Sequence, residues 1–125
     1  MDIRETHLNG HTYRTALVPD DLWTKHWSDR AQANLSKHGG GDPAKAPWCT
    51  ACGRLLNPAK AQTVHIIGGG GEVLHPDDEA EWEAAHGARG DDGDMGAWDL
   101  GPECAKMFPA AFRSAYSVEA HLRAR

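Results

Sequence analysis

The sequence predicts a small α+β protein of one compact domain, and three features lead to this prediction. A paired-cysteine motif, C-x-x-C-G, occupies residues 49–53. A segment rich in β-branched side chains at 62–67 and a shorter segment with Val73 and Leu74 flank four consecutive glycines at 68–71, a pattern typical of a β-hairpin. An apolar stripe with helical spacing precedes the cysteines. The length of 125 residues matches one ordinary domain.

Residues 1–41 are expected to form an N-terminal arm with a strand and a helix. Residues 11–18 combine β-branched and aromatic side chains in rough alternation, which favours extended structure. Pro19-Asp20-Asp21 then starts a helix, because acids are favourable at its positive end. The helix continues to about Lys37 along a stripe of Trp23, Trp27, Ala31 and Leu35. We expect both tryptophans to pack against the rest of the protein.

Residues 47–108 are expected to form the central module, after a linker rich in glycine. It begins with the cysteine turn and continues with the two strands of the hairpin. Proline and acidic residues then predict a short helix, followed by a third strand and a second helix. In chain order, these elements are predicted over 62–67, 72–75, 76–86, 97–100 and 101–108.

Two further segments complete the predicted organisation. Residues 87–96 contain four glycines and three aspartates, so we expect a mobile acidic loop there. After Pro109, a weak apolar stripe predicts a C-terminal helix over 109–125.

Charge and composition argue against several classes of protein. The formal net charge is −5 and no block of Lys or Arg is present, which disfavours nucleic-acid binding because phosphate contacts supply most of its affinity. No apolar run approaches the roughly 20 residues of a membrane span. The first five residues do not resemble a signal peptide, so we expect a cytoplasmic protein with reduced thiols.

The three cysteines predict a structural zinc site. Cys49 and Cys52 are separated by two residues, which places both sulfurs on one side of a tight turn, and Gly53 lets the chain bend. Cys104 lies at an expected helix start, where the helix dipole favours a thiolate. Zinc requires four N or S donors, so a histidine is expected as the fourth. A cysteine turn, a hairpin and a helix with a further ligand follow the order of a treble-clef or zinc-ribbon-like site.

The fourth ligand is open among several residues. We favour His65, which lies in the first strand of the hairpin, close to the glycine turn. His75 lies at the far end of the hairpin and is the second candidate. His86, an acidic residue or an N-terminal histidine are the remaining alternatives.

Other interpretations of the cysteines and glycines are weaker. A redox C-x-x-C pair would need a preceding strand in a βαβ unit, and Cys104 alone could be a small buried residue. An HNH endonuclease would need an Asn after His65, but Asn9, Asn34 and Asn57 all precede it. The four glycines lack the Lys-Ser/Thr of a phosphate-binding loop, and no H-E-x-x-H motif of a zinc protease is present.

The motifs of the module resemble a group of small uncharacterised proteins of phages, plasmids and other bacterial mobile elements. The resemblance covers about residues 48–108 and is carried by C-x-x-C-G-R at 49–54 and by Gly-Pro-x-Cys at 101–104. Val64-His65, Gly69-Gly70 and Asp94-Met95-Gly96 also match this pattern. The resemblance implies that the module binds zinc.

Two function classes follow from these observations. We expect a zinc-stabilised module that binds another protein and is not an enzyme, and a mobile-element origin would suit an inhibitor of a host defence system. The alternative is a nucleic-acid-binding zinc module that uses the basic residues Arg54, Lys60, Arg113, Arg123 and Arg125. The negative net charge favours the protein partner.

Overall fold

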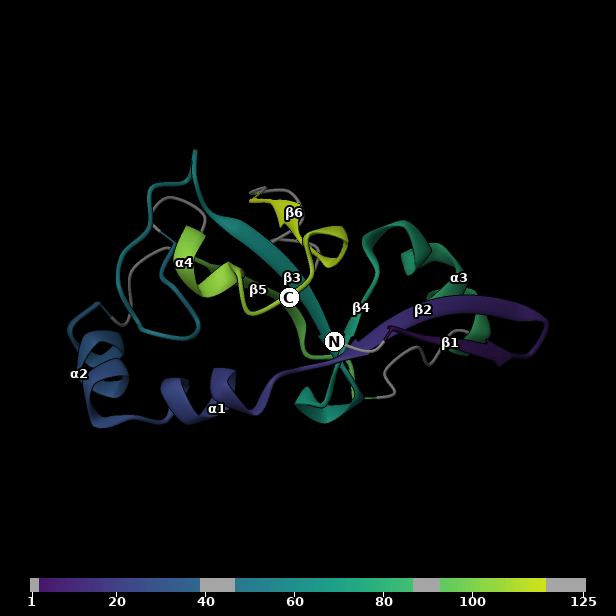
Figure 1. Ribbon diagram of the computed structural model, residues 1–125, viewed down its shortest axis with the longest axis horizontal. Helices are drawn as coiled ribbons and strands as arrows, with labels where there is room; N and C mark the ends of the chain where they lie inside the picture. Colours follow the sequence, from purple (N-terminus) through teal and green to yellow (C-terminus); the bar gives the residue numbers. More distant parts are fainter. Residues whose placement is uncertain (1–2, 39–46, 87–92, 117–125) are drawn as a thin grey trace.

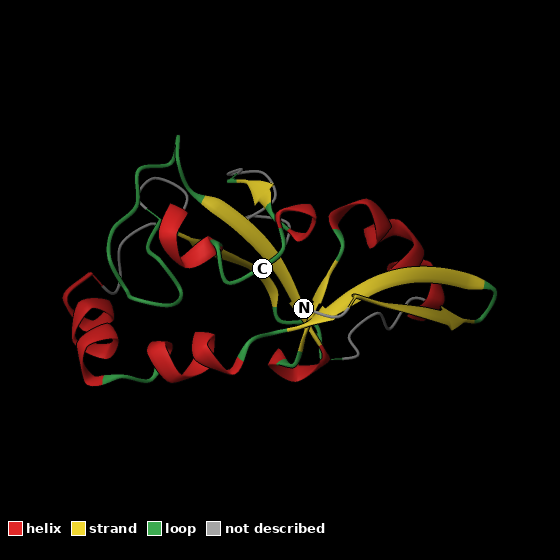
Figure 2. Cartoon of the chain, viewed as in Figure 1, coloured by secondary structure: helices red, strands yellow, loops and turns green. Residues whose placement is uncertain are grey.

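A computed structural model of the chain describes residues 3–38, 47–86 and 93–116 as an antiparallel sheet flanked by short helices (Figure 1). Two helices lie at one end of the molecule, and the hairpin formed by the first two strands extends at the other end (Figure 2). The strands follow the order β1-β2-β4-β3-β5, and a short sixth strand also pairs with β3. The predicted α+β class is therefore confirmed, and the strands form one antiparallel sheet.

The first hairpin joins the N-terminal residues to the sheet. β1 (Ile3–Leu8) and β2 (His11–Leu17) are connected by Asn9 and Gly10, whose φ angles of 51° and 80° suit a tight hairpin turn. β2 also pairs with β4 (Glu72–Leu74). The strand predicted over 11–18 is present, and it pairs with a neighbouring strand on each side within one continuous sheet.

β3 (Gln62–Ile67) is the strand on which the sheet is assembled. One edge pairs with β5 (Gly96–Leu100). The other edge is shared by β4, which pairs with the end of β3, and by β6 (Ser114–Ala115), which pairs with its start. The predicted hairpin of β3 and β4 is confirmed, with the glycines forming the turn.

The alternation of side chains along β3 divides the core into two clusters. Val64 and Ile66 belong to the larger cluster, which also contains Cys49 and Cys104. Ile67 belongs to the smaller cluster, together with Trp82 of α3 (Glu79–His86). Successive residues of a strand point to opposite faces, so one face of the sheet supports the cysteines and the other supports α3.

The predicted helix at 20–37 is divided into α1 (Asp20–His26) and α2 (Asp29–His38). Ser28 makes the break, because its hydroxyl donates to the carbonyl of Lys25 at 2.6 Å and accepts from the amide of Ala31 at 3.2 Å. Serine is favoured at this capping position because it satisfies a free amide of the new helix.

The break separates the two tryptophans that the helical spacing placed on one face. Trp23 packs on the larger cluster and donates from Nε1 to the carbonyl of Gly70 at 2.9 Å. Trp27 lies at the end of α1 and is 68% exposed. The prediction that Trp27 packs against the module is therefore wrong, because the stripe is interrupted after one turn.

The C-terminal segment also differs from its prediction. The described part after Pro109 forms a 3₁₀ turn, Ala110–Phe112, and then β6, because Phe112 is buried and the chain continues onto the edge of β3. The rest of the predicted helix and most of the predicted loop at 87–96 lie outside the described residues. Within the described ranges, no helix has the length and apolar character needed to cross a membrane.

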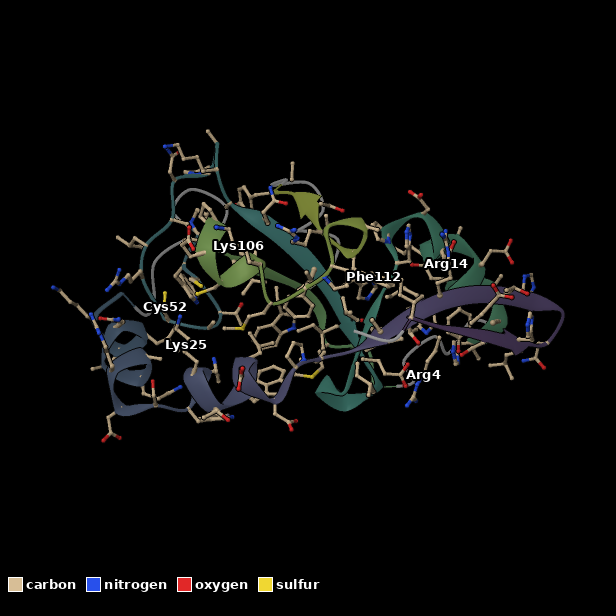
Figure 3. The ribbon with its side chains drawn as sticks, in the orientation of Figure 1. Arg4, Arg14, Lys25, Cys52, Lys106 and Phe112 are labelled. Atoms are coloured by element: carbon tan, nitrogen blue, oxygen red, sulfur yellow. The ribbon has the colours of Figure 1, made fainter. Side chains whose placement is uncertain are left out.

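Asp78 fixes the edge of β2 where its pairing with β4 ends. Its Oδ2 accepts from both the backbone amide and Nε of Arg14 at 2.8 Å, and Oδ1 accepts from Nη2 at 3.0 Å. These bonds lower the pKa of Asp78, with the Arg14 side-chain bond as the main cause. Figure 3 shows Arg14 beside the segment that carries α3.

The two tryptophans of α1 predict different effects on stability. Trp23→Ala should lower the free energy of unfolding by about 3 kcal/mol, because it removes a packed ring and its hydrogen bond. Trp27→Ala should change it by no more than about 0.5 kcal/mol, because the ring is mostly in solvent. Denaturant unfolding of both variants checks this, and equal losses would contradict it.

The Asp78 interaction predicts a pH-dependent contribution to stability. The folded pKa lies below the unfolded value of about 3.9, so the contribution is present above that value and is lost as pH falls through the folded pKa. Asp78→Asn should therefore lower the melting temperature clearly at pH 6 and much less near pH 2. Asp77→Asn is the control, because that side chain is 82% exposed. A difference independent of pH would show that the carboxylate charge is unimportant.

Candidate metal centre

The first two cysteines lie in a tight turn that precedes β3. The amide of Gly53 donates to the carbonyl of Cys49 at 2.7 Å, and the amide of Cys49 donates to the carbonyl of Arg54 at 2.8 Å. An isolated bridge between Trp48 and Leu55 closes the base of the turn. The segment thereby holds both cysteine side chains on one side, as the C-x-x-C-G spacing predicts.

Gly53 is required by its conformation and by its surroundings. Its φ angle is +75°, in the left-handed region that favours glycine. A Cβ at this position would lie 2.6 Å from the carbonyl oxygen of Ala31 and 2.8 Å from Cβ of Asn34. The turn therefore packs directly on α2, which could not approach as closely if residue 53 had a side chain.

The third cysteine is supplied by α4 (Pro102–Ala105). This short helix follows β5 directly, and its proline occupies the first turn, where no amide partner is needed. Cys104 is 6% exposed and packs in the same cluster as Cys49, which is fully buried. The prediction that Cys104 lies at a helix start is confirmed.

The three sulfur atoms of Cys49, Cys52 and Cys104 all lie within 4.8 Å of one another. All three cysteines are free thiols. Sulfurs converging from a turn and from a helix form three donors of the kind that bind zinc and other soft metal ions. The cluster could therefore hold a metal ion, as expected from the sequence.

A hydrogen bond between two of these cysteines favours the thiolate form of Cys49 by lowering its pKa. The thiol of Cys52 bonds to Cys49, and this bond is the main cause that lowers the pKa of Cys49 to about 7. The same bond, followed by burial, raises the pKa of Cys52 above its ordinary value. A metal ion bound by both sulfurs would displace the protons that remain on them, because only deprotonated thiols are ligands.

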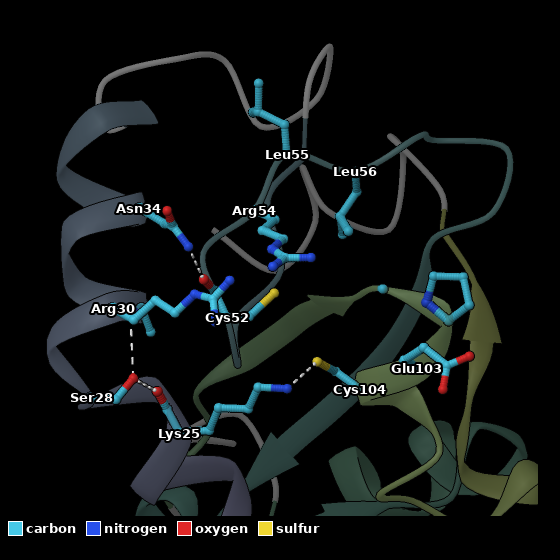
Figure 4. A pocket seen from close by; sticks show the side chains of 13 residues that line it. Lys25, Ser28, Arg30, Asn34, Cys52, Arg54, Leu55, Leu56, Glu103 and Cys104 are labelled. Carbon is cyan, nitrogen blue, oxygen red and sulfur yellow. Dashed lines mark hydrogen bonds between the residues drawn. The ribbon is translucent and has the colours of Figure 1, made fainter.

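Lys25 adds a positive charge to the cluster. Its Nζ lies 3.2 Å from Sγ of Cys104, and this bond is the main cause that raises the pKa of Lys25. Figure 4 shows the ammonium group reaching from the end of α1 to the sulfur on α4. No sequence pattern signals this contact, because it joins positions 79 residues apart.

Helices α1 and α2 also bind the backbone of the cysteine turn. Nδ1 of His26 lies 2.6 Å from the carbonyl oxygen of Thr50, and Nδ2 of Asn34 donates to the carbonyl of Cys52 at 2.9 Å. From the sequence we expected one helix of an N-terminal arm that packs on the module through its tryptophans. The structure makes α1 and α2 the support of the cysteine turn.

The structure does not bring His65 to the cysteines. Its Nε2 lies 2.7 Å from Oδ1 of Asp94, and its ring packs edge-on against Trp82, with 5.4 Å between ring centres. Because His65 alternates with Val64 and Ile66 along β3, it projects from the face opposite to the cysteines. The sequence located the strand correctly but could not determine which of its faces would meet the cysteines.

The alternative histidines also lie elsewhere. Nδ1 of His75 accepts from the amide of Asp77 at 3.1 Å, and its ring contacts Phe112. His86 lies at the end of α3, with its ring beside Trp82 and 5.3 Å between ring centres. Among the described residues, no histidine or carboxylate joins the three sulfurs as a fourth donor.

A pocket of about 420 Å³ opens beside two of the sulfurs (Figure 4). Cys52 and Cys104 form part of its wall, and α1, α2, the segment after the cysteine turn and α4 supply the rest. Its charged lining residues are Lys25, Arg30, Arg54 and Glu103, and its apolar ones include Leu55 and Leu56.

Comparison with known proteins does not place the chain in a family. No protein-family model, curated protein or solved structure matches it. The chemistry of the cysteine cluster is therefore the basis on which a function can be argued.

The contact between Gly53 and α2 predicts a sensitive position. Gly53→Ala should lower the free energy of unfolding by about 2 kcal/mol or more, because the new Cβ combines left-handed strain with a close approach to Ala31. Gly71→Ala is the matched control, because Gly71 has a φ of −90° and its Cβ would meet only the oxygen of Gly68 at 3.5 Å. Thermal unfolding of the two variants checks this, and equal melting temperatures would contradict it.

Proposed function

We propose that the chain is a zinc-stabilised module that binds another protein. The observation that carries the proposal is the convergence of three sulfurs within 4.8 Å, from segments far apart in the sequence. Thiolates are preferred ligands of zinc, and three of them favour zinc over magnesium or calcium. The order of cysteine turn, hairpin and ligand-bearing helix supports a treble-clef-like arrangement.

A structural role for the metal is supported by what the sulfurs connect. The cysteine turn contacts α2 through Gly53, and α4 contacts α1 through Lys25 and Cys104. A metal ion on the sulfurs would link the cysteine turn directly to α4, and these two elements in turn contact α2 and α1. The described helices are short, with seven, ten, eight and four residues, so few local contacts stabilise them. Metal binding would add to the free energy of folding and so stabilise this arrangement of short helices.

A protein partner is supported by charge and by exposed apolar side chains. The net charge of −5 disfavours nucleic acid. Trp27 is 68% exposed and Leu55 is 51% exposed, and both lie on elements that support the cysteine cluster. Tryptophan is enriched in protein interfaces, where it contributes much of the affinity. The resemblance to mobile-element proteins extends the proposal to a host protein, such as a component of a defence system.

The zinc proposal predicts the metal content and its dependence on each cysteine. The purified protein should contain one zinc ion per chain by elemental analysis, as one tetrahedral site implies. Cys52→Ser and Cys104→Ser should each lose the metal and unfold at least partly. Zinc binding contributes about 10–16 kcal/mol to the folding of small zinc peptides, so these losses should be large.

Histidine variants test whether a histidine is a ligand of the proposed metal. His65→Ala and His75→Ala should retain the zinc, because both rings have other partners. The absence of metal, together with a reversible disulfide between Cys49 and Cys52, would overturn the proposal in favour of a redox pair. Loss of zinc in His65→Ala would contradict the position of this residue on the other face of the sheet.

A further inference from the structure

The pocket beside the cysteines is not explained by a structural metal alone. A metal held only by protein donors needs no cavity next to it, because structural zinc sites are closed. Here Cys52 and Cys104 both form part of the wall of a cavity of about 420 Å³. Within the described part of the chain, only the three sulfurs meet as donors. If these three thiolates held a zinc ion, one position of its tetrahedron would be left for another donor, and a ligand in the cavity could approach from the side of Cys52 and Cys104.

The charges around the cavity favour an anion. A divalent ion with three thiolates carries one net negative charge, which the ammonium of Lys25 balances at 3.2 Å from Cys104. Glu103, the acidic residue of the lining, is bonded to Lys106 at 3.2 Å. The negative charge of a metal bound by three thiolates would thus be balanced by Lys25, and that of Glu103 is balanced by Lys106.

Two guanidinium groups remain for a ligand. Figure 4 shows Arg30 reaching from α2 and Arg54 from the segment after the cysteine turn, both toward Cys52. Neither has a carboxylate partner within ion-pair distance among the described residues, unlike Arg14 with Asp78. Guanidinium groups bind carboxylate and phosphate through two parallel hydrogen bonds, so a pair of them forms a suitable oxyanion site.

We propose that this pocket binds a small organic oxyanion at the open position of the metal. The oxyanion lies between Arg30 and Arg54 and reaches the metal as its fourth ligand. The apolar part of the molecule lies against Leu55 and Leu56, which line the same cavity. The shared chemistry is that of a carboxylate or a phosphate ester. The proposal depends on the zinc site proposed above, because the metal supplies one of the contacts.

The test uses the full chain with its zinc replaced by Co²⁺. Co²⁺ occupies tetrahedral thiolate sites, and its visible absorption bands change when its fourth ligand changes. Acetate, benzoate, inorganic phosphate and phenyl phosphate are titrated separately. Benzoate and phenyl phosphate should bind more tightly than acetate and phosphate, because their rings contact the leucines. Comparison of the two ring compounds decides between the carboxylate and the phosphate.

Three variants locate the binding. Arg30→Gln and Arg54→Gln should each weaken the tighter ring compound about tenfold or more, the value of one lost charge-assisted hydrogen bond. Arg4→Gln is the matched control, because Arg4 lies in the exposed strand β1, away from the pocket (Figure 3). The zinc content of all three variants should equal that of the unchanged protein.

Each other outcome overturns the proposal in a recognisable way. If the protein contains zinc but no titration changes the Co²⁺ bands, the pocket does not supply the fourth ligand, while the zinc module stands. If alanine substitution of a histidine removes the metal, the fourth ligand comes from the chain and the position is closed. If the protein contains no zinc at all, the proposed function fails together with this inference.

Discussion

The pairing of β3 with three other strands is the constraint on which the rest of the structure depends. β3 bonds to β4 and β6 along one edge and to β5 along the other, so every later element is positioned relative to it. Its alternation then assigns each side chain to one of two faces. Val64 and Ile66 support the cysteine face, while Ile67 supports the face covered by α3.

The cysteine cluster lies on one of these faces, where the cysteine turn, α2 and the junction of β5 with α4 come together. The turn at 49–53 packs on α2 through Gly53, and its backbone also bonds to β5 through the amide of Thr50 and the carbonyl of Asp99 at 2.8 Å. α4 begins where β5 ends, which brings Cys104 to the same place. The sulfurs are thus positioned by the sheet and by the helices together, and a metal would join elements that are already adjacent.

Charge distinguishes the surroundings of this cluster from the chain as a whole. The protein has a net charge of −5, yet Lys25, Arg30 and Arg54 surround the pocket beside the sulfurs. Local basic surroundings stabilise thiolates and attract anions, independently of the net charge. The overall acidity therefore argues against a nucleic-acid partner, while the pocket itself is suited to a small oxyanion.

The sequence by itself determined the cysteine turn and most of the strands, and it pointed to the three cysteines, because these features depend on local patterns. The spacing of Cys49 and Cys52, the glycine turn between β3 and β4, and the Gly-Pro pair at the start of α4 each act within a few residues. Only the tertiary structure decided which face of β3 met the cysteines, and therefore that His65 lies away from them. It also decided that Lys25 reaches Cys104, because packing brings α1 beside α4. Trp27 remains exposed because α1 packs on the core through Leu22 and Trp23 instead.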